Sequence, residues 1–260
     1  MKVVILCGGQ GTRIRDVADN IPKPMIPVGG YPILWHIMKY YSTFGHHEFI
    51  LCLGHLGKVI KDYFLNYEVN TSDFTIKLGD KESIKFHNKT DENDWKITFA
   101  ETGKKAMTGS RVRKIKKYIG DDQTFLLTYG DGLSDVNIDQ LISFHNEHGR
   151  ILTLTGVRPA GRFGEIKCSD EGVISEFNEK PQTAEGRING GFFVCDQRLF
   201  DYLDDNDDLV FEKEPMMKLV NNKQLMQFNH NGFWQPMDTY REYILLNSLY
   251  ENKNAPWIKW

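Results

Sequence analysis

The chain has 260 residues, 40% hydrophobic and 26% charged, so it can bury a sizeable core and is too apolar to be disordered. A net charge of −3 argues against a nucleic-acid partner, and no run approaches the roughly 20 apolar residues of a membrane span. The four cysteines stand far apart without a CxxC pair, which favours buried reduced thiols and a cytoplasmic protein over disulfides or zinc.

Short apolar runs that end in glycine alternate with amphipathic segments along the first part of the chain. Val3–Cys7 predicts a buried parallel strand, Pro32–Tyr41 a helix that stops at Gly45, and Phe49–Leu53 a second strand. Strand, helix and strand at this spacing indicate a βαβ unit.

The later segments extend this pattern. Strands are expected at Thr124–Tyr129, Ile151–Val157 and Gly191–Cys195, and helices at Lys58–Asn66 and Ile138–Glu147. The expected fold is α/β: a single Rossmann-like domain over residues 1–260, with a mainly parallel mixed sheet flanked by helices. Residues 68–98 are expected to form an antiparallel excursion, and residues 196–260 to form C-terminal helices around a tryptophan-bearing segment.

A glycine-rich loop, Gly8–Arg13, directly follows the first predicted strand. Open α/β sheets bind ligands at the carboxyl ends of their strands, and glycines let backbone N–H groups approach phosphate oxygens. Arg13 and Lys23 supply positive charge for a polyphosphate. The loop lacks a Walker A sequence, and Ile14 stands where a dinucleotide fingerprint requires a small residue. A tight turn without a ligand is the alternative.

Two aspartates are candidates for a metal site. Asp131 follows a predicted strand within the sequence YGDG, and Asp238 lies within GFWQPMDT. Carboxylates are hard ligands that suit Mg²⁺, but these two can meet only through the fold. A role for each in a turn is the alternative.

The loop GGQGTR followed by PKPM at Pro22–Met25 resembles the signature of the nucleoside-diphosphate-sugar pyrophosphorylases. YGDG and GFWQPMDT resemble the metal-binding motifs of one branch, the glucose-1-phosphate cytidylyltransferases. Further matches to that branch follow in the same order: PILWHIMK at Pro32–Lys39, MTGSR at Met107–Arg111, RFG at Arg162–Gly164, EKP at Glu179–Pro181, INGGFFV at Ile188–Val194 and APW at Ala255–Trp257.

The resemblance implies transfer of a cytidylyl group from CTP to α-D-glucose 1-phosphate, with Mg²⁺ as cofactor. The products would be CDP-glucose, for the deoxysugars of surface polysaccharides, and pyrophosphate, and the protein would be a homo-oligomer.

The resemblance also implies catalytic roles for Arg13, Lys23 and Asp131, and metal binding by Asp131 and Asp238. The nucleotide-binding residues it implies are Leu6, Gly8, Gly9, Gln10, Gly11, Thr12, Arg13, Lys23, Thr108, Arg111 and Gly130. Those for the sugar phosphate are Lys180, Asn189 and Gly190. Without the resemblance, Arg111 and Lys180 would be expected as solvated surface cations.

Two departures from the family pattern leave alternatives open. Ser110 stands where glycine is usual, and Arg187 where tryptophan commonly precedes ING. Because Arg187 puts a cation near the acceptor segment, an acceptor that is more anionic than glucose 1-phosphate, or is not glucose at all, is one alternative. Separately, the same chemistry with UTP or dTTP as donor, or with a different sugar phosphate, is another. From other classes, the alternatives are a catalytically silent nucleotide-sugar sensor and a nicotinamide oxidoreductase.

Overall fold

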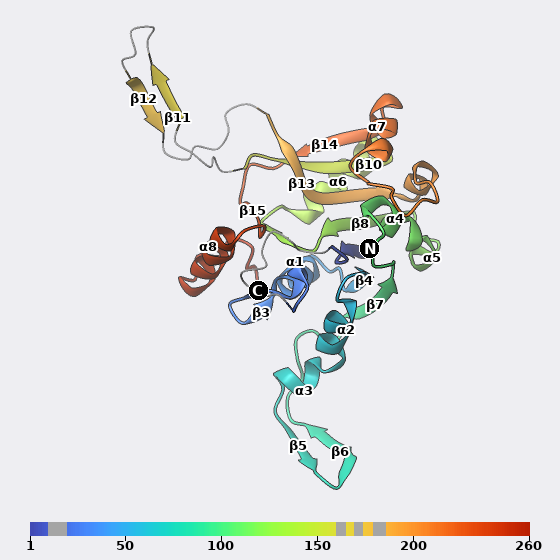
Figure 1. Ribbon diagram of the computed structural model, residues 1–260, viewed down its shortest axis with the longest axis vertical. Coiled ribbons are helices and arrows are strands. Elements are labelled where there is room, and N and C mark those ends of the chain that lie inside the picture. The colour runs from blue at the N-terminus through green and yellow to red at the C-terminus, as the bar shows by residue number, and fades with distance from the viewer. Residues whose placement is uncertain (10–19, 160–164, 169–173, 179–185) are drawn as a thin grey trace.

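A seven-stranded sheet forms the centre of the computed structural model, which describes residues 1–9, 20–159, 165–168, 174–178 and 186–260 (Figure 1). The strands lie in the order β14-β10-β13-β8-β1-β4-β7. Their bounds are β1 Lys2–Leu6, β4 Glu48–Leu53, β7 Lys96–Glu101, β8 Thr124–Tyr129, β10 Leu152–Val157, β13 Ile188–Asp196 and β14 Leu225–Asn229. Only β13 runs antiparallel to its two neighbours, β8 and β10, among these strands. The predicted α/β fold with a mainly parallel mixed sheet is confirmed.

Alternation along the strands gives the sheet two apolar faces, and helices cover both. In β1, Val3 and Ile5 belong to one buried cluster and Val4 to the other, and all three side chains are fully buried. On the first face pack α1 Ile33–Ser42, α2 Gly57–Leu65, α6 Ile138–His148 and α8 Tyr240–Glu251. On the second pack α4 Thr108–Lys114, α5 Lys116–Ile119, the 3-10 helix η3 Gln197–Tyr202 and α7 Glu214–Asn221. Two buried cores therefore hold three layers together.

Helix ends follow the local chemistry of the sequence. α1 begins directly after Pro32, as predicted, because proline suits a position before the first helical residues. At the start of α6, the side chain of Asn137 accepts from the backbone N–H of Gln140, and the helix ends at Gly149 with φ of 60°.

Small antiparallel pairs extend from the central layers. They are β2 Pro27–Val28 with β3 Tyr31–Pro32, β5 Phe74–Lys77 with β6 Asp80–Phe86, β9 Gly132–Ser134 with β15 Trp234–Pro236, and β11 Glu165–Cys168 with β12 Ile174–Asn178. The β5–β6 hairpin follows α3, Tyr67–Thr71, and projects away from the sheet (Figure 1). Residues 96–98, which the sequence placed in the excursion, open β7 of the main sheet. The single-domain assignment stays a prediction.

The cysteines that the structure describes with their side chains are free and buried. Cys7, Cys52 and Cys195 are each fully inaccessible to solvent, and burial raises the pKa of every one of these thiols. They therefore behave as small apolar core residues, as expected. Within the described parts of the chain, none of the helices is long and apolar enough to cross a bilayer.

Candidate functional site

A cleft of about 930 Å³ lies beyond the carboxyl ends of β1 and β8. This is where an open α/β sheet binds its ligands. Of the predicted site residues, the cleft is lined by Leu6, Gly8, Gly9, Lys23, Thr108, Arg111, Gly130, Asp131, Asn189, Gly190 and Asp238. Gln10, Gly11, Thr12, Arg13 and Lys180 lie outside the described residues. Predicted nucleotide-side and acceptor-side residues thus share one cavity.

Lys23 joins the two candidate metal aspartates. Its Nζ donates to Oδ2 of Asp131 at 2.5 Å and to Oδ1 of Asp238 at 2.5 Å. Because both oxygens contact the same nitrogen, their separation cannot exceed the sum of these two distances. Each aspartate side chain is 33% exposed, whereas that of Lys23 is 11% exposed. The fold therefore brings both carboxylates to one point in the cleft.

The small β9–β15 ladder explains this convergence. Asp131 directly precedes β9, and Asp238 follows β15 by two residues. In the antiparallel register Gly132 is paired with Pro236, and just beyond it the backbone N–H of Met237 donates to the carbonyl oxygen of Asp131 at 2.8 Å. Antiparallel pairing places the start of one strand opposite the end of the other, so the two aspartates become neighbours.

Lys23 and Asp238 both extend from restrained backbone. Lys23 opens the 3-10 helix η2, Lys23–Met25, where Pro22 and Pro24 restrict the chain on both sides. Asp238 directly precedes the capping box of α8, and its backbone N–H donates to Oε2 of Glu242 at 2.7 Å. The charged side chains therefore extend from anchored positions.

Opposing effects act on the ammonium group of Lys23. Burial lowers its pKa, but the negative charges and hydrogen bonds of Asp131 and Asp238 outweigh burial and raise it above the usual value. The side chain is therefore a permanent cation between two carboxylates.

The donor set fits a magnesium ion that is completed by its substrate. Asp131 and Asp238 offer oxygen ligands in the cleft, and no group of three or more acidic, histidine or cysteine ligands occurs among the described residues. Mg²⁺ is commonly bound by one or two carboxylates, with waters and substrate phosphates in its other positions. Asp131 and Asp238 are the described residues that would hold such an ion, and it would supply positive charge for phosphate oxygens.

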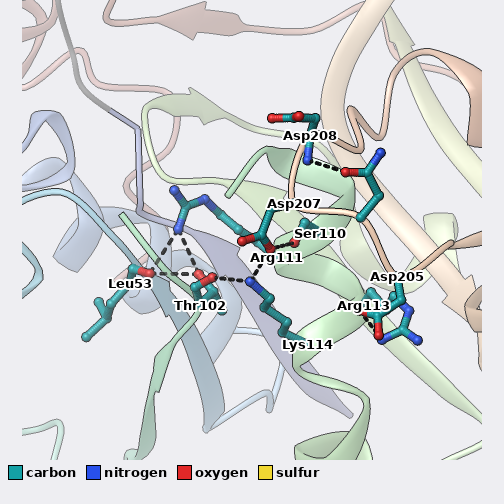
Figure 2. Close-up of polar contacts among 10 residues, drawn as sticks. Leu53, Thr102, Ser110, Arg111, Arg113, Lys114, Asp205, Asp207 and Asp208 are labelled. Atoms are coloured by element: carbon teal, nitrogen blue, oxygen red, sulfur yellow. Dashed lines mark hydrogen bonds and ion pairs between the residues drawn. The ribbon is translucent and has the colours of Figure 1, made fainter. Parts of the chain in front are cut away.

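Arg111 is buried rather than on the surface, and its guanidinium points towards Leu53 and Thr102 (Figure 2). Its side chain donates to the carbonyl oxygens of Gly8 at 3.0 Å and Leu53 at 2.9 Å, and to the hydroxyl of Thr102 at 2.7 Å. The residue is 4% exposed, and burial lowers its pKa. A solvated surface position is therefore wrong, and Arg111 ties together the ends of neighbouring strands at the floor of the cleft.

This contact supplies a second reason for glycine at position 8. A Cβ on Gly8 would lie 2.1 Å from Nη1 of Arg111, whereas a Cβ on Gly9 would meet none of the described residues within 4 Å. Gly8 therefore makes room for the arginine, and Gly9 leaves open space towards the cleft.

The segment from Asn189 to Gly191 is fixed in the opposite wall. Oδ1 of Asn189 accepts from the N–H of Gly191 at 2.9 Å, and Nδ2 donates to the hydroxyl of Tyr129 at 3.2 Å. Gly191 has φ of 77°, and a Cβ there would lie 2.3 Å from the Tyr129 ring. The carbonyl oxygen of Gly190 accepts from Nε1 of Trp234 at 2.7 Å. Positive φ and close packing thus require glycine at position 191, and at position 190 a Cβ would lie 2.6 Å from Cγ1 of Val157.

Comparison with known proteins agrees with this geometry. Residues 2–253 match the family described as nucleotidyl transferase. The chain belongs to the nucleotidyl transferase family. It is 45% identical over 260 residues to "Glucose-1-phosphate cytidylyltransferase" of Salmonella typhi, and 44% identical to "Probable glucose-1-phosphate cytidylyltransferase" of Bacillus subtilis. Both alignments cover 100% of this chain and of the relative. The predicted family is confirmed, and with it a nucleotide and a sugar phosphate as the classes of substrate.

A solved structure supports the fold independently. The crystal structure of HddC from Yersinia pseudotuberculosis superimposes with a TM-score of 0.67 at 21% identity, covering 96% of this chain and 99% of that one. At this identity the likeness concerns the nucleotidyl transferase fold and not the substrate.

Several side chains in the nucleotidyl transferase cleft were not singled out from the sequence. Lys104 and Lys105 line it from the loop before α4, and Tyr129 and Trp234 line it from β8 and β15. The two adjacent lysines just ahead of MTGSR were a visible signal of positive charge. The aromatic residues gave no such signal, since strand ends carry aromatics for many reasons.

Arg187 and Ser110, two departures from the family pattern, lie outside the cleft lining. Arg187 donates to the carbonyl oxygens of Gly156 at 3.0 Å and His230 at 2.8 Å, which fastens the residue before β13 to β10 and to the loop after β14. Ser110 is 2% exposed and donates from Oγ to Oδ1 of Asp207 at 3.0 Å (Figure 2). Neither residue lines the described cavity, so the geometry gives no support to a more anionic acceptor.

A serine, a histidine and an aspartate also meet outside the cleft, but not as a nucleophilic triad. Ser134 Oγ and Asp135 Oδ1 both contact Nε2 of His230, at 3.4 and 3.0 Å, and the hydroxyl of Ser134 donates to the carbonyl oxygen of Phe233. A triad requires serine and aspartate on different ring nitrogens. This cluster is a structural contact of the β9–β15 region.

Proposed function

We propose that this protein transfers a cytidylyl group from CTP to α-D-glucose 1-phosphate, releasing pyrophosphate and CDP-glucose. The observation that carries the proposal is the meeting of Lys23, Asp131 and Asp238 in one cleft, in a chain that resembles cytidylyltransferases over its whole length. A glycine-lined floor, cations and two carboxylates suit the joining of two phosphate-bearing substrates.

The reaction needs positioning and charge neutralisation more than acid–base chemistry. A sugar phosphate has a second pKa near about 6 and is mostly dianionic at neutral pH, so its oxygen can attack the α-phosphorus of CTP without a general base. The bond from the α-phosphorus to the bridging oxygen then breaks, and pyrophosphate leaves with the electron pair. Lys23, turned from the carboxylates to the triphosphate, would stabilise the negative charge that grows on the leaving group. By resemblance, Arg13 has the same role.

The described walls of the cleft suggest where each substrate binds. Gly8 and Gly9 would admit phosphate oxygens to the backbone, with Leu6, Thr108, Arg111 and Gly130 around the nucleotide, and Asn189 and Gly190 would contact the sugar. By resemblance alone, Lys180, which lies outside the described residues, would bind the phosphate of the sugar. We propose Mg²⁺ on Asp131 and Asp238, where a bound ion would supply Lewis-acid charge neutralisation and hold phosphate oxygens in place. A homo-oligomer, a cytoplasmic location and a place in deoxysugar supply for surface polysaccharides belong to the same proposal.

A pyrophosphate-release assay tests the proposal. Purified protein is incubated with Mg²⁺ and each of CTP, UTP, dTTP and GTP, against glucose 1-phosphate and other sugar 1-phosphates. We expect the largest kcat/KM for CTP with glucose 1-phosphate, a requirement for both substrates, and loss of turnover with EDTA. Faster turnover of another pair would replace the substrate assignment. Binding of a nucleotide sugar without turnover of any pair would favour the sensor.

A further inference from the structure

Glu212 occupies a position between the two sides of the cleft, although the sequence gave it no role. Its Oε1 accepts from the hydroxyl of Tyr129 at 2.5 Å, and its Oε2 accepts from the hydroxyl of Thr108 at 2.7 Å. Thr108 opens α4 beside the predicted nucleotide site, whereas Tyr129 ends β8 against Asn189. The carboxylate of Glu212 therefore accepts from one hydroxyl on the nucleotide side of the cleft and from one on the acceptor side.

The carboxylate fixes the direction of a chain of hydrogen bonds. An ionised carboxylate only accepts, so the Tyr129 hydroxyl must donate its single hydrogen to Glu212. Burial raises the pKa of Tyr129, and Glu212 raises it further, so the hydroxyl keeps that hydrogen. Its oxygen then has only lone pairs left for Asn189, which must present Nδ2.

A second contact independently assigns the same orientation to the Asn189 amide. The N–H of Gly191 can only donate, and it lies 2.9 Å from the other end of that amide, which must therefore be Oδ1. With Oδ1 taken by Gly191 and one Nδ2 hydrogen taken by Tyr129, the second Nδ2 hydrogen of this cleft-lining side chain has no partner among the described residues.

We propose that Glu212, acting through Tyr129, is a positioning residue that makes Asn189 a hydrogen-bond donor to the acceptor substrate. The sugar phosphate is then recognised here through an oxygen that accepts from Nδ2, such as a hydroxyl oxygen. This assignment rests on the proposed function, because it takes Asn189 as part of the acceptor site.

The test compares three variants with the wild-type enzyme. Tyr129→Phe removes the hydroxyl that links the carboxylate to the amide. Glu212→Gln keeps the shape but can donate as well as accept, so it no longer dictates the direction of the chain. The double variant carries both changes. Each single variant is expected to raise KM for the sugar phosphate about fivefold to tenfold. Tyr129→Phe leaves the contact between Glu212 and Thr108 in place, so it is expected to change KM for CTP less than twofold.

The double variant distinguishes this positioning role from a general structural role of the two residues. If the two residues act through one chain, the double variant raises KM for the sugar phosphate no more than the larger single effect. Tyr202→Phe is the matched control, because the Tyr202 hydroxyl also accepts from an amide, Nδ2 of Asn222 at 3.1 Å, away from the cleft lining. It is expected to leave both KM values unchanged.

Three results would overturn the assignment in an active wild-type enzyme. They are an unchanged acceptor KM in Tyr129→Phe, multiplicative effects in the double variant, and equal rises in the KM of both substrates in Tyr129→Phe. A wild-type enzyme without cytidylyl transfer would overturn the proposed function itself and this assignment with it, so the two failures are distinguishable.

Discussion

The backbone N–H of Met237 donates to the carbonyl oxygen of Asp131 at 2.8 Å, and this bond joins two segments that are far apart in the sequence. It continues the β9–β15 ladder by one step, to the point where Asp238 comes beside Asp131. Lys23 then closes the arrangement by contacting both side chains. The predicted metal pair therefore depends on backbone pairing, which fixes the separation of the carboxylates before any ligand binds.

Neutralising either carboxylate should remove activity without unfolding the protein. Asp131→Asn and Asp238→Asn keep the side-chain shape and an oxygen that can accept from Lys23, but each removes half of the negative charge offered to Mg²⁺. We expect kcat to fall on the order of 10³-fold, since metal charge stabilisation is worth several kcal/mol. The pyrophosphate-release assay measures the rate, and circular dichroism with thermal melting checks the fold.

Asp205→Asn is the control for these variants. Asp205 is 80% exposed and pairs with Arg113 at 3.1 Å, and a surface pair of this kind contributes little. Its kcat should match the wild type within error. A rate near the wild-type value in either cleft variant would contradict the metal assignment.

The sequence predicted the elements whose ends carry strong local signals. The helix after Pro32 and the strand Thr124–Tyr129 begin where expected, because proline fixes the backbone and apolar runs fix buried strands. Asp131 and Asp238 could be named as candidates from their motifs, but their contact could not be derived. A two-strand ladder between segments 107 positions apart, from 131 to 238, leaves no local pattern.

Hydrogen bonds from side chains to backbone carbonyl oxygens could not be predicted from the sequence either. Arg111 lies in a basic run that is typical of a solvated surface, yet its guanidinium is satisfied by the carbonyl oxygens of Gly8 and Leu53. Carbonyl groups are the same in every residue, so only the fold determines which ones an arginine reaches. The contacts of Glu212 could not be predicted for a related reason, because its two hydroxyl partners lie at the end of a strand and at the start of a helix that are separate in the sequence.

Adjacent glycines in the first loop should respond differently to the same substitution. Gly8→Ala would force a Cβ to within 2.1 Å of the Arg111 guanidinium, so we expect a loss of stability of about 1–3 kcal/mol together with weaker CTP binding. Gly9→Ala adds a Cβ that meets none of the described residues within 4 Å, and it should leave the melting temperature unchanged. If phosphate oxygens approach this backbone, it should still raise KM for CTP. Equal melting temperatures for the two variants would show that the Arg111 contact is not a constraint.

The two lysines assigned to phosphate should separate kinetically. Lys23→Ala removes the cation at the point where charge develops, so we expect it mainly to lower kcat. Lys180→Ala is expected mainly to raise KM for the sugar phosphate, because that lysine would bind the acceptor in the ground state and in the transition state alike. Steady-state kinetics with each substrate varied in turn distinguish these effects. The reverse pattern would mean that the two roles are exchanged.

Acid should destabilise the fold through His36, which links α1 to the C-terminal segment. Nε2 of His36 donates to the carbonyl oxygen of Val28 at 2.8 Å, and Nδ1 accepts from Nε1 of Trp257 at 3.3 Å. Burial lowers the pKa of His36 to about 4 from an ordinary 6.5, although the bond to Val28 opposes this shift. A second proton would occupy the lone pair that accepts from Trp257, so the neutral ring is the form that fits.

The sign of the pH effect follows from this lowered pKa. Between about pH 6.5 and pH 4 the unfolded chain takes up a proton at this histidine and the folded protein does not, so stability is complete above pH 6.5 and falls as pH decreases. One such group accounts for a loss of about 3 kcal/mol at most. His36→Gln should reduce the slope of the unfolding free energy against pH across this window. Urea unfolding at pH 7, 6, 5 and 4.5 measures the slope, and parallel curves for wild type and His36→Gln would assign the acid sensitivity to other groups, such as the buried His145, whose pKa burial also lowers to about 4.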